Sequence, residues 1–452
     1  MGKRLAALLL SLAATVASGQ MVQEAFAQDP GPLDFVRGEG YEQAILQSLT
    51  GDALVGLDAS GRVVPRLAAS WRQGKDGGLA FRLRPDARFT DGSPARPTDV
   101  AWTLRTLQAD PQASPTKRAI LDGAEVEIRG GQVSIRSPKP AARLLLELAR
   151  IPIAREGHPD LGTGPFQLRH EHGAWRLLRR DHFLHPRIEG LQFRLLGDSE
   201  AMAQALEKGW LSLGVPPARL QAHPPPGYRV VAQPLAYQLV VWSRLGPGPL
   251  QALERWRKDA FPPHLLGLGA HPSRGLWPET LGFEPRAIAA RPVPLPAGRP
   301  LELLYAAGDG PVEKLLMALR ARARQDGVEL DLRPLDPALL VARLQKGEFG
   351  LACFIATFDP EPWSVLEYLE PDGPMNFTGW RHPALAGLVT RLREPGSAAW
   401  RDLQALWAQA PGALPLVDFT SILWVDRRLH VTPGPLGLYL GTPGAAGWRW
   451  EE

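Results

Sequence analysis

The sequence contains very little cysteine: Cys353 is the only one in 452 residues. A single thiol cannot form an intrachain disulfide, and its place in the apolar run Leu351 to Ala356 is typical of a small buried side chain. A strong charge bias is missing too, since 51 Lys and Arg residues stand against 47 Asp and Glu residues. No Lys/Arg cluster is interleaved with aromatic residues, which argues against a nucleic-acid-binding protein.

The sequence also lacks the local motifs of common enzymes. It has no GxSxG elbow, no HExxH and no P-loop lysine motif, and its carboxylates do not recur at a catalytic spacing. His170 and His172 lie two apart on a predicted strand, with His182 and His185 nearby, and such a set could bind a metal. This stretch is Arg-rich and lacks an obvious carboxylate set, so we interpret it as a solvated strand face. We expect no enzyme activity and no cofactor or metal.

Long apolar runs are absent except at the N-terminus. There two basic residues precede the apolar run Leu5 to Ala17, and Ala25-Phe26-Ala27 then offers a small-x-small cleavage site. This pattern predicts a secretory signal peptide over residues 1–27, cleaved near Ala27. No cysteine follows it, so no lipid anchor is expected, and we predict an exported chain retained in a Gram-negative periplasm.

Residues 54–104 predict a small β-rich unit followed by a helix. Leu79, Phe81 and Leu83 alternate with less apolar residues, as in a half-buried strand, and Thr98 stands at a predicted helix N-cap after Pro97. The stretch "LRPDARFTDGSPARPTDVAWTL" closely resembles the N-terminal signature of the family 5 extracellular solute-binding proteins. These are the peptide, oligopeptide and nickel receptors of bacterial ABC importers.

Two further stretches extend the resemblance. Gly162-Thr163-Gly164-Pro165 opens a predicted hairpin and resembles the family's "GTGPY.L" element, which returns the chain from the second lobe to the first. Next, a predicted strand at Ile188 to Leu196 and a predicted helix at Ser199 to Lys208 follow in the family's order. The resemblance is weaker over 106–159 and 245–295.

Residues 301–358 predict strand, helix, strand, helix and strand in turn. Helical periodicity predicts a helix over Val312 to Ala323, ended by Gly327. A second helix is predicted at Pro337 to Lys346 and ends at Gly347. Phe349 to Phe358 is nearly all apolar, as expected for a strand covered on both faces. The alternation predicts parallel strands with right-handed crossovers.

The resemblance implies an α/β fold like that of the periplasmic binding proteins. Two α/β lobes would surround a cleft, and an extra β-rich lobe would be inserted in the first. The expected order is a signal peptide at 1–27, a discontinuous first lobe at 28–52, 160–241 and 412–452, an inserted second lobe at 53–159 and a third lobe at 242–411.

Asp359 is the strongest candidate for a ligand contact. It follows a buried strand at its C-terminal end, where open α/β sheets place their ligands, and Phe358 and Trp363 flank it. In peptide-binding relatives the motif "GdFD…W.aDypDP" holds an Asp that binds the ligand's α-amino group, and the resemblance carries this role to Asp359. The full set of expected ligand-binding residues is Asp359, Phe358, Trp363, Thr357, Asn376, Trp380, Tyr41 and Trp242.

The predicted function is therefore solute capture by a monomeric periplasmic receptor that delivers small peptides to an inner-membrane ABC permease. A receptor or sensor for a non-peptide ligand, such as a nickel–chelator complex, is the alternative. A secreted hydrolase is a weaker alternative, because nothing in the sequence supports it positively.

Overall fold

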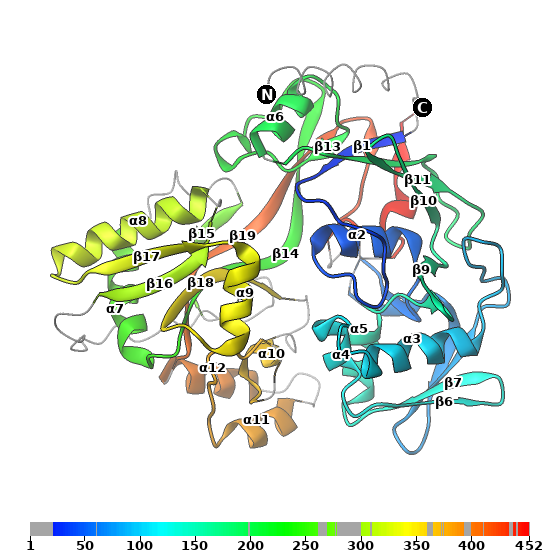
Figure 1. The fold of residues 1–452 in the computed structure, drawn as a ribbon, viewed down its shortest axis with the longest axis horizontal. Helices are drawn as coiled ribbons and strands as arrows, with labels where there is room; N and C mark the ends of the chain where they lie inside the picture. Colours follow the sequence, from blue (N-terminus) through cyan, green and yellow to red (C-terminus); the bar gives the residue numbers. More distant parts are fainter. Residues whose placement is uncertain are drawn as a thin grey trace. The chain divides into compact units, whose positions relative to one another are not determined.

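The computed structural model describes residues 21–451 apart from 60, 198, 261–268, 276, 278–299, 308–309, 359–364, 372, 374, 393–398, 410, 434–436 and 440–441. The chain divides into two compact units (Figure 1). Unit 1 comprises Met1–Pro217, Gln221–Gln233 and Ile422–Glu452, and unit 2 comprises Ala218–Leu220 and Pro234–Ser421. The lobe boundaries expected above remain a prediction.

Unit 1 is built around two four-stranded sheets, ordered β1-β12-β11-β10 and β4-β5-β7-β6, with the strand pairs β2-β3, β8-β9 and β20-β21 beside them. Its strands are β1 (Met21–Phe26), β2 (Val55–Leu57), β3 (Val63–Pro65), β4 (Ala68–Gln73), β5 (Leu79–Leu83), β6 (Glu125–Arg129), β7 (Gln132–Arg136), β8 (Ala154–Arg155), β9 (His158–Gly162), β10 (Phe166–Glu171), β11 (Ala174–Arg179), β12 (Gly190–Leu195), β13 (Leu213–Gly214), β20 (Leu429–His430) and β21 (Arg449–Trp450). Its helices are α2 (Tyr41–Thr50), α3 (Pro97–Ala109), α4 (Pro115–Ile120), α5 (Ala141–Leu148) and α6 (Ser199–Glu207).

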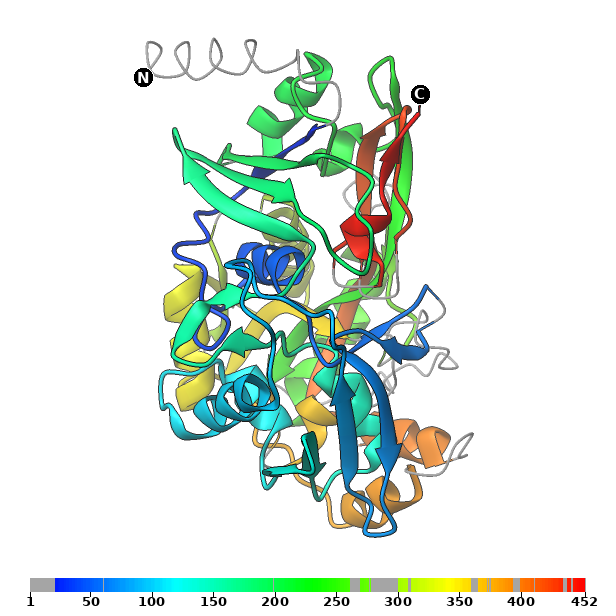
Figure 2. The same cartoon turned by 90° about the vertical axis from the view of Figure 1, so that its right-hand side faces the viewer.

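Unit 2 is built on the larger sheet, whose strand order is β13-β19-β14-β18-β16-β17. The first of these strands, β13, belongs to unit 1, and a further strand, β15, pairs with β19. Its strands are β14 (Tyr228–Ser243), β15 (Ala270–Pro272), β16 (Leu301–Ala306), β17 (Leu330–Leu335), β18 (Leu351–Phe358) and β19 (Ala413–Asp426). Its helices are α7 (Pro247–Ala260), α8 (Gly310–Gln325), α9 (Pro337–Lys346), α10 (Leu366–Leu369), α11 (Leu385–Leu392) and α12 (Ala399–Gln409). The long strands β14 (green) and β19 (orange-red) lie side by side (Figure 2), and each continues from one unit into the other.

The strand–helix alternation predicted over 301–358 is confirmed. β16 pairs in parallel with both β17 and β18, as the alternation predicts. The Asp336 side chain caps the N-terminus of α9 by accepting from the Ala338 backbone N–H at 2.9 Å. Gly347, at φ 68°, ends the same helix in the left-handed conformation that glycine adopts without strain.

Helix α3 begins two residues earlier than the sequence predicts. The expected N-cap was Thr98, but the helix starts at Pro97 and its N-cap is Arg96. Pro fits the first helical position because its missing N–H has no helical partner there. Asp99 completes the cap by accepting a hydrogen bond from the Arg96 backbone N–H at 2.7 Å.

The cleavage site expected near Ala27 conflicts with the structure. Residues Met21–Phe26, assigned above to the signal peptide, form strand β1, and all six pair in parallel with β12. Val22 and Phe26 are 0% and 2% exposed, and the Phe26 ring stacks on Phe193 with centroids 4.3 Å apart. Cleavage near Ala27 would remove a buried strand from unit 1, so this expectation is corrected.

Three separate hydrophobic cores hold the described residues together. One lies in unit 2 and includes Trp242, Trp256 and Trp407. Two lie in unit 1: one is formed around Phe81 and Leu104, and the other around Phe26 and Trp448. In the part of the chain that the structure describes, none of the helices has the length and apolar character that crossing a membrane requires.

Candidate functional site

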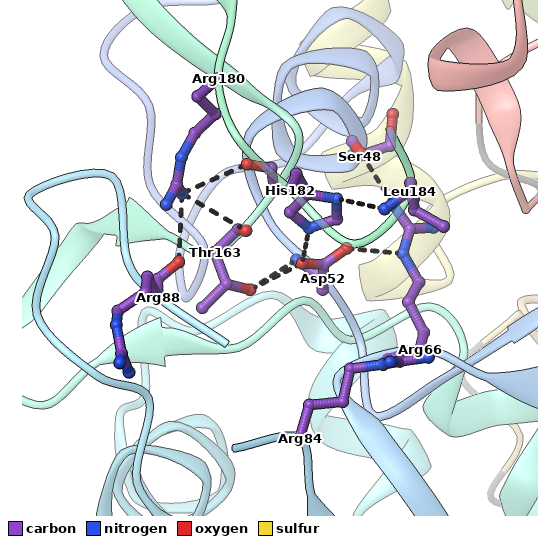
Figure 3. A network of polar contacts seen from close by, with 10 residues as sticks. Ser48, Asp52, Arg66, Arg84, Arg88, Thr163, Arg180, His182 and Leu184 are labelled. Carbon is purple, nitrogen blue, oxygen red and sulfur yellow. Dashed lines mark hydrogen bonds and ion pairs between the residues drawn. The ribbon is translucent and has the colours of Figure 1, made fainter. Parts of the chain in front are cut away.

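A sealed polar network lies in unit 1 around the carboxylate of Asp52 (Figure 3). Arg66 Nε donates to Asp52 Oδ1 at 2.8 Å, and Thr163 Oγ1 donates to Oδ2 at 3.0 Å. His182 Nε2 lies 2.9 Å from the same Oδ2, while its Nδ1 accepts from the Leu184 backbone N–H at 3.1 Å. This second bond assigns the proton of a neutral imidazole to Nε2, which therefore donates to Asp52.

The charge of Asp52 is fixed by its surroundings. Burial raises the pKa of its carboxyl, but the Arg66 guanidinium and the hydrogen bond from His182 outweigh burial and hold the pKa well below its usual range. Asp52 is fully buried, and its hydrogen-bond partners enclose it. An ionised carboxylate without access to solvent cannot serve as an acid or a base, so we assign this network a structural role.

The network also explains the Gly-Thr-Gly-Pro element. The Gly164 backbone N–H donates to the Thr50 carbonyl at 2.8 Å, and a Cβ on Gly164 would clash with the Thr50 backbone. Thr163, between the two glycines, accepts from the Asp52 backbone N–H at 3.2 Å. Arg180 closes the arrangement by donating to the Arg88 carbonyl at 3.1 Å (Figure 3). The motif therefore clamps the end of α2 by close backbone contact.

The four histidines considered for metal binding do not converge. His182 belongs to the Asp52 network, whereas His170 stacks on Trp175 in the β10–β11 hairpin, with centroids 4.9 Å apart. Among the described residues there is no group of three or more His, Cys, Asp and Glu side chains that could hold a metal ion.

Two of the candidate ligand residues, Thr357 and Phe358, are the last two residues of β18 in unit 2, and Trp242 lies on the paired strand β14. β18 pairs antiparallel with β14 along all eight of its residues, from Leu351↔Ser243 to Phe358↔Ala236. Its parallel ladder with β16 covers only the first three residues and ends at Tyr305↔Cys353. On the β16 side, residues 354–358 have no strand partner among the described residues. This end of β18 is therefore an open sheet edge.

One face of this strand end carries a ladder of aromatic rings. Trp242 is stacked between Phe354 and Tyr368, at centroid distances of 5.4 and 5.0 Å. Phe358 continues the ladder at 5.2 Å from Tyr368. Trp242 and Phe358, both expected as ligand contacts, are 3% and 5% exposed. Their rings are buried within this ladder and pack against one face of the strand.

The opposite face is partly exposed. Ile355 is 40% exposed, Thr357 is exposed, and Tyr237 lies directly across the ladder from Thr357. Phe419 packs beside Tyr237, with ring centroids 5.7 Å apart, and burial raises the pKa of the Tyr237 phenol. We call these four residues, Tyr237, Ile355, Thr357 and Phe419, the open strand face. The expectation that both faces of Phe349 to Phe358 are covered holds only for the first half of β18.

Sequence reasoning missed Tyr237, Ile355 and Phe419. The period-2 alternation of β18 does put Ile355 and Thr357 on the face opposite Phe354 and Phe358. It does not say which face is left uncovered, because that depends on which distant segments pack over each face of the sheet.

Asn376 organises the loop after α10. Its Nδ2 donates to the carbonyls of Glu370 and Trp380, both at 3.0 Å, and its Oδ1 accepts from the Trp380 backbone N–H at 3.1 Å. Both amide hydrogens are thus used within the loop. Trp380 is half-buried and packs against Trp407, with centroids 4.8 Å apart. The loop holds Trp380 in place through Asn376.

Three expected contacts remain. Tyr41, the first residue of α2, is 52% exposed and belongs to unit 1. Asp359 and Trp363 lie outside the described residues. Asp359 directly follows the last residue of β18.

Comparison with known proteins connects this chain to one family. Residues 62–237 match the family described as bacterial extracellular solute-binding proteins, family 5 Middle. This match confirms the resemblance to family 5. Family 5 is a family of binding receptors for import, and the matched segment of this chain includes the four-stranded sheet β4-β5-β7-β6 and the Gly-Thr-Gly-Pro clamp. No curated protein sequence matches the chain.

Solved structures of similar fold extend the comparison over almost all of the chain. The murein tripeptide binding protein MppA of Escherichia coli is 15% identical, with a TM-score of 0.78, covering 96% of this chain and 99% of its own. A dipeptide binding protein from Pseudoalteromonas sp. SM9913, in complex with Met-Leu, is 13% identical, with a TM-score of 0.79 and coverage of 96% and 100%. NikA from Brucella suis, in complex with Fe(III)-EDTA, is 17% identical, with a TM-score of 0.78 and coverage of 95% and 100%. The predicted fold class, that of the family 5 periplasmic binding proteins, is confirmed.

Proposed function

We propose that this chain is the solute receptor of an ABC importer and that it captures di- to oligopeptides for delivery to an inner-membrane permease. The observation that carries the proposal is the open edge of β18, which extends beyond its ladder with β16 and ends directly before Asp359. An extended peptide can add to such an edge as a further strand, through main-chain hydrogen bonds that do not depend on its side chains.

The ends and side chains of the peptide would be recognised by different groups. We assign the α-amino group to Asp359, because a carboxylate forms a charge-assisted hydrogen bond with an ammonium. Thr357, Trp363, Trp380 and Tyr41 are the proposed side-chain contacts. Phe358 and Trp242 are buried and would support strand β18, and Asn376 would fix the loop that carries Trp380.

Ligand capture in this proposal is a binding event without bond chemistry, enzyme activity or a cofactor. Strands β14 and β19 continue from one unit into the other, and bending at these crossings is the motion that we propose for closure. The chain would reach the periplasm through an N-terminal signal peptide and act there as a monomer.

Isothermal titration calorimetry on the mature protein tests the ligand class. The probes are di- to pentapeptides, the same peptides with an acetylated N-terminus, and nickel chelates. A ligand at a hundredfold excess over its Kd also stabilises the folded state by about 2.7 kcal/mol, so thermal shift provides a second readout. Free peptides should bind, and both acetylation and Asp359→Asn should weaken binding by at least tenfold, or about 1.4 kcal/mol.

A matched control separates the anchor from a general loss of charge. Asp402 pairs with Arg391 on the surface of unit 2, where its side chain is 54% exposed, so Asp402→Asn should leave binding unchanged. Binding of chelates alone would replace the peptide proposal with the alternative that NikA illustrates. If Asp359→Asn does not change peptide affinity, peptides remain the proposed ligands, but Asp359 does not bind their α-amino group.

A further inference from the structure

Strand β1 is the first described element after the N-terminal apolar run in the sequence, and backbone hydrogen bonds attach it to the rest of unit 1. Besides its ladder with β12, the Gln23 backbone N–H donates to Ser212 Oγ at 2.9 Å, and the Ser212 N–H donates back to the Gln23 carbonyl at 2.7 Å. The Leu196 N–H donates to the Phe26 carbonyl at 3.0 Å. The strand is therefore paired from its first residue to its last.

Side chains of β1 also reach the C-terminal segment of the chain. Glu24 is 9% exposed and accepts a hydrogen bond from the phenol of Tyr439. Tyr439 is itself 4% exposed and packs against Trp448, with ring centroids 5.3 Å apart. Loss of β1 would open the core shared by both ends of the chain and leave these buried groups without their partners.

The sequence offers an earlier cleavage site that spares this strand. Ala17-Ser18-Gly19 has small residues at its first and third positions and directly follows the apolar run, as in a signal-peptide cleavage site. The pattern at Ala25-Phe26-Ala27 comes after three polar residues, Gln20, Gln23 and Glu24, and lies partly within β1.

We propose that a signal peptidase cleaves this chain between Gly19 and Gln20, an inference that rests on the export proposed above. Water adds across the Gly19–Gln20 peptide bond, which leaves a carboxylate on the released leader and an amino group on Gln20. The mature chain then begins one residue before β1 and keeps the whole strand.

The test is the N-terminal sequence and intact mass of the protein recovered from the periplasm of a Gram-negative host that expresses the full chain. A chain that starts at Gln20 supports the proposal, and one that starts at Gln28 overturns it. An uncleaved chain that begins at Met1 overturns both this proposal and the export on which it rests. Peptide binding is measured separately, so a protein that starts at Gln20 and binds no peptide would overturn only the ligand assignment.

Two variants make the assignment specific. Gly19→Leu places a bulky residue at the proposed site and should leave the precursor uncleaved, whereas Ala27→Leu, at an exposed position, should be processed as the wild type is. The reverse pattern would overturn the proposal. Chains produced without export and starting at Gln20 or at Gln28 give a second readout: the shorter one should lose its cooperative unfolding transition or unfold at a lower temperature, and equal melting temperatures would count against the proposal.

Discussion

The Nε atom of Arg66 lies 2.8 Å from Oδ1 of Asp52, and the two side chains are only 7% and 0% exposed. Removing one partner of a buried ion pair leaves the other charge without compensation. We therefore expect Arg66→Met to lower the free energy of unfolding by about 3–5 kcal/mol, measured by urea denaturation. The control is Arg391→Met, which breaks the exposed pair with Asp402 and should cost no more than about 1 kcal/mol. Equal effects of the two substitutions would contradict the structural role of the Asp52 network.

Glu24 should make stability depend on pH. Burial raises the pKa of its carboxyl to about 8, against the lowering effect of the hydrogen bond from Tyr439. Between the ordinary pKa of 4.5 and about 8, the folded state keeps a proton that the unfolded state releases, so the free energy of unfolding falls as pH rises through this window.

Glu24→Gln cannot ionise, and it should escape this loss. At pH 8 its free energy of unfolding should exceed that of the wild type by a few kcal/mol, on the order of 1.4 kcal/mol for each unit by which the pKa is raised. At pH 4 the two proteins should be about equally stable. Urea denaturation at the two pH values measures the difference. Glu127→Gln, at a side chain that is 46% exposed, serves as the control and should show no such pH dependence. A Glu24→Gln effect of the same size at both pH values would refute the buried-carboxyl explanation.

The open strand face should be sensitive to charge where the peptide would lie. Ile355→Lys places an ammonium on this face and should weaken peptide binding at least tenfold, or about 1.4 kcal/mol. Val341→Lys makes the same change on α9, where the side chain is 48% exposed against 40% for Ile355. Both are surface substitutions with small expected effects on stability. Titration calorimetry should show a loss of affinity only for Ile355→Lys, and equal affinities would exclude this face from the site.

Trp242 should affect stability more than binding. Because its ring is buried between Phe354 and Tyr368, Trp242→Ala should lower the free energy of unfolding by about 3–5 kcal/mol. Peptide affinity, measured below the unfolding transition, should stay within about threefold of the wild type, a change of under 1 kcal/mol. If affinity collapses while stability is kept, Trp242 contacts the ligand directly.

The parts of the fold that the sequence predicted well are those governed by local pattern. The helices and strands of 301–358 follow from periodicity and from the caps at Asp336, Gly327 and Gly347, which lie within or beside each element. Strand β1 was missed because its six residues overlap a small-x-small pattern, and its partner strand begins at Gly190, far along the chain. Local composition carries no information about such a partner.

The candidate site shows the same division. The position of Asp359 after a buried strand could be predicted from the sequence, because β18 is a continuous apolar run. The open strand face could not, since the exposure of Ile355 depends on which distant segments pack over that face of the sheet. The pairing of Asp52 with His182, 130 residues apart, likewise depends on how the chain returns through the Gly-Thr-Gly-Pro clamp.

The contact between Glu24 and Tyr439 joins residues 415 positions apart, so unit 1 contains nearly the first and nearly the last residues of the chain. Contacts of such long sequence separation form late, because the loop between them must first be closed. Unit 2 draws almost all of its residues from the single segment Pro234–Ser421 and has a core of its own. We therefore expect unit 2 to fold before the core around Phe26 and Trp448, which remains incomplete until the C-terminal segment has been synthesised.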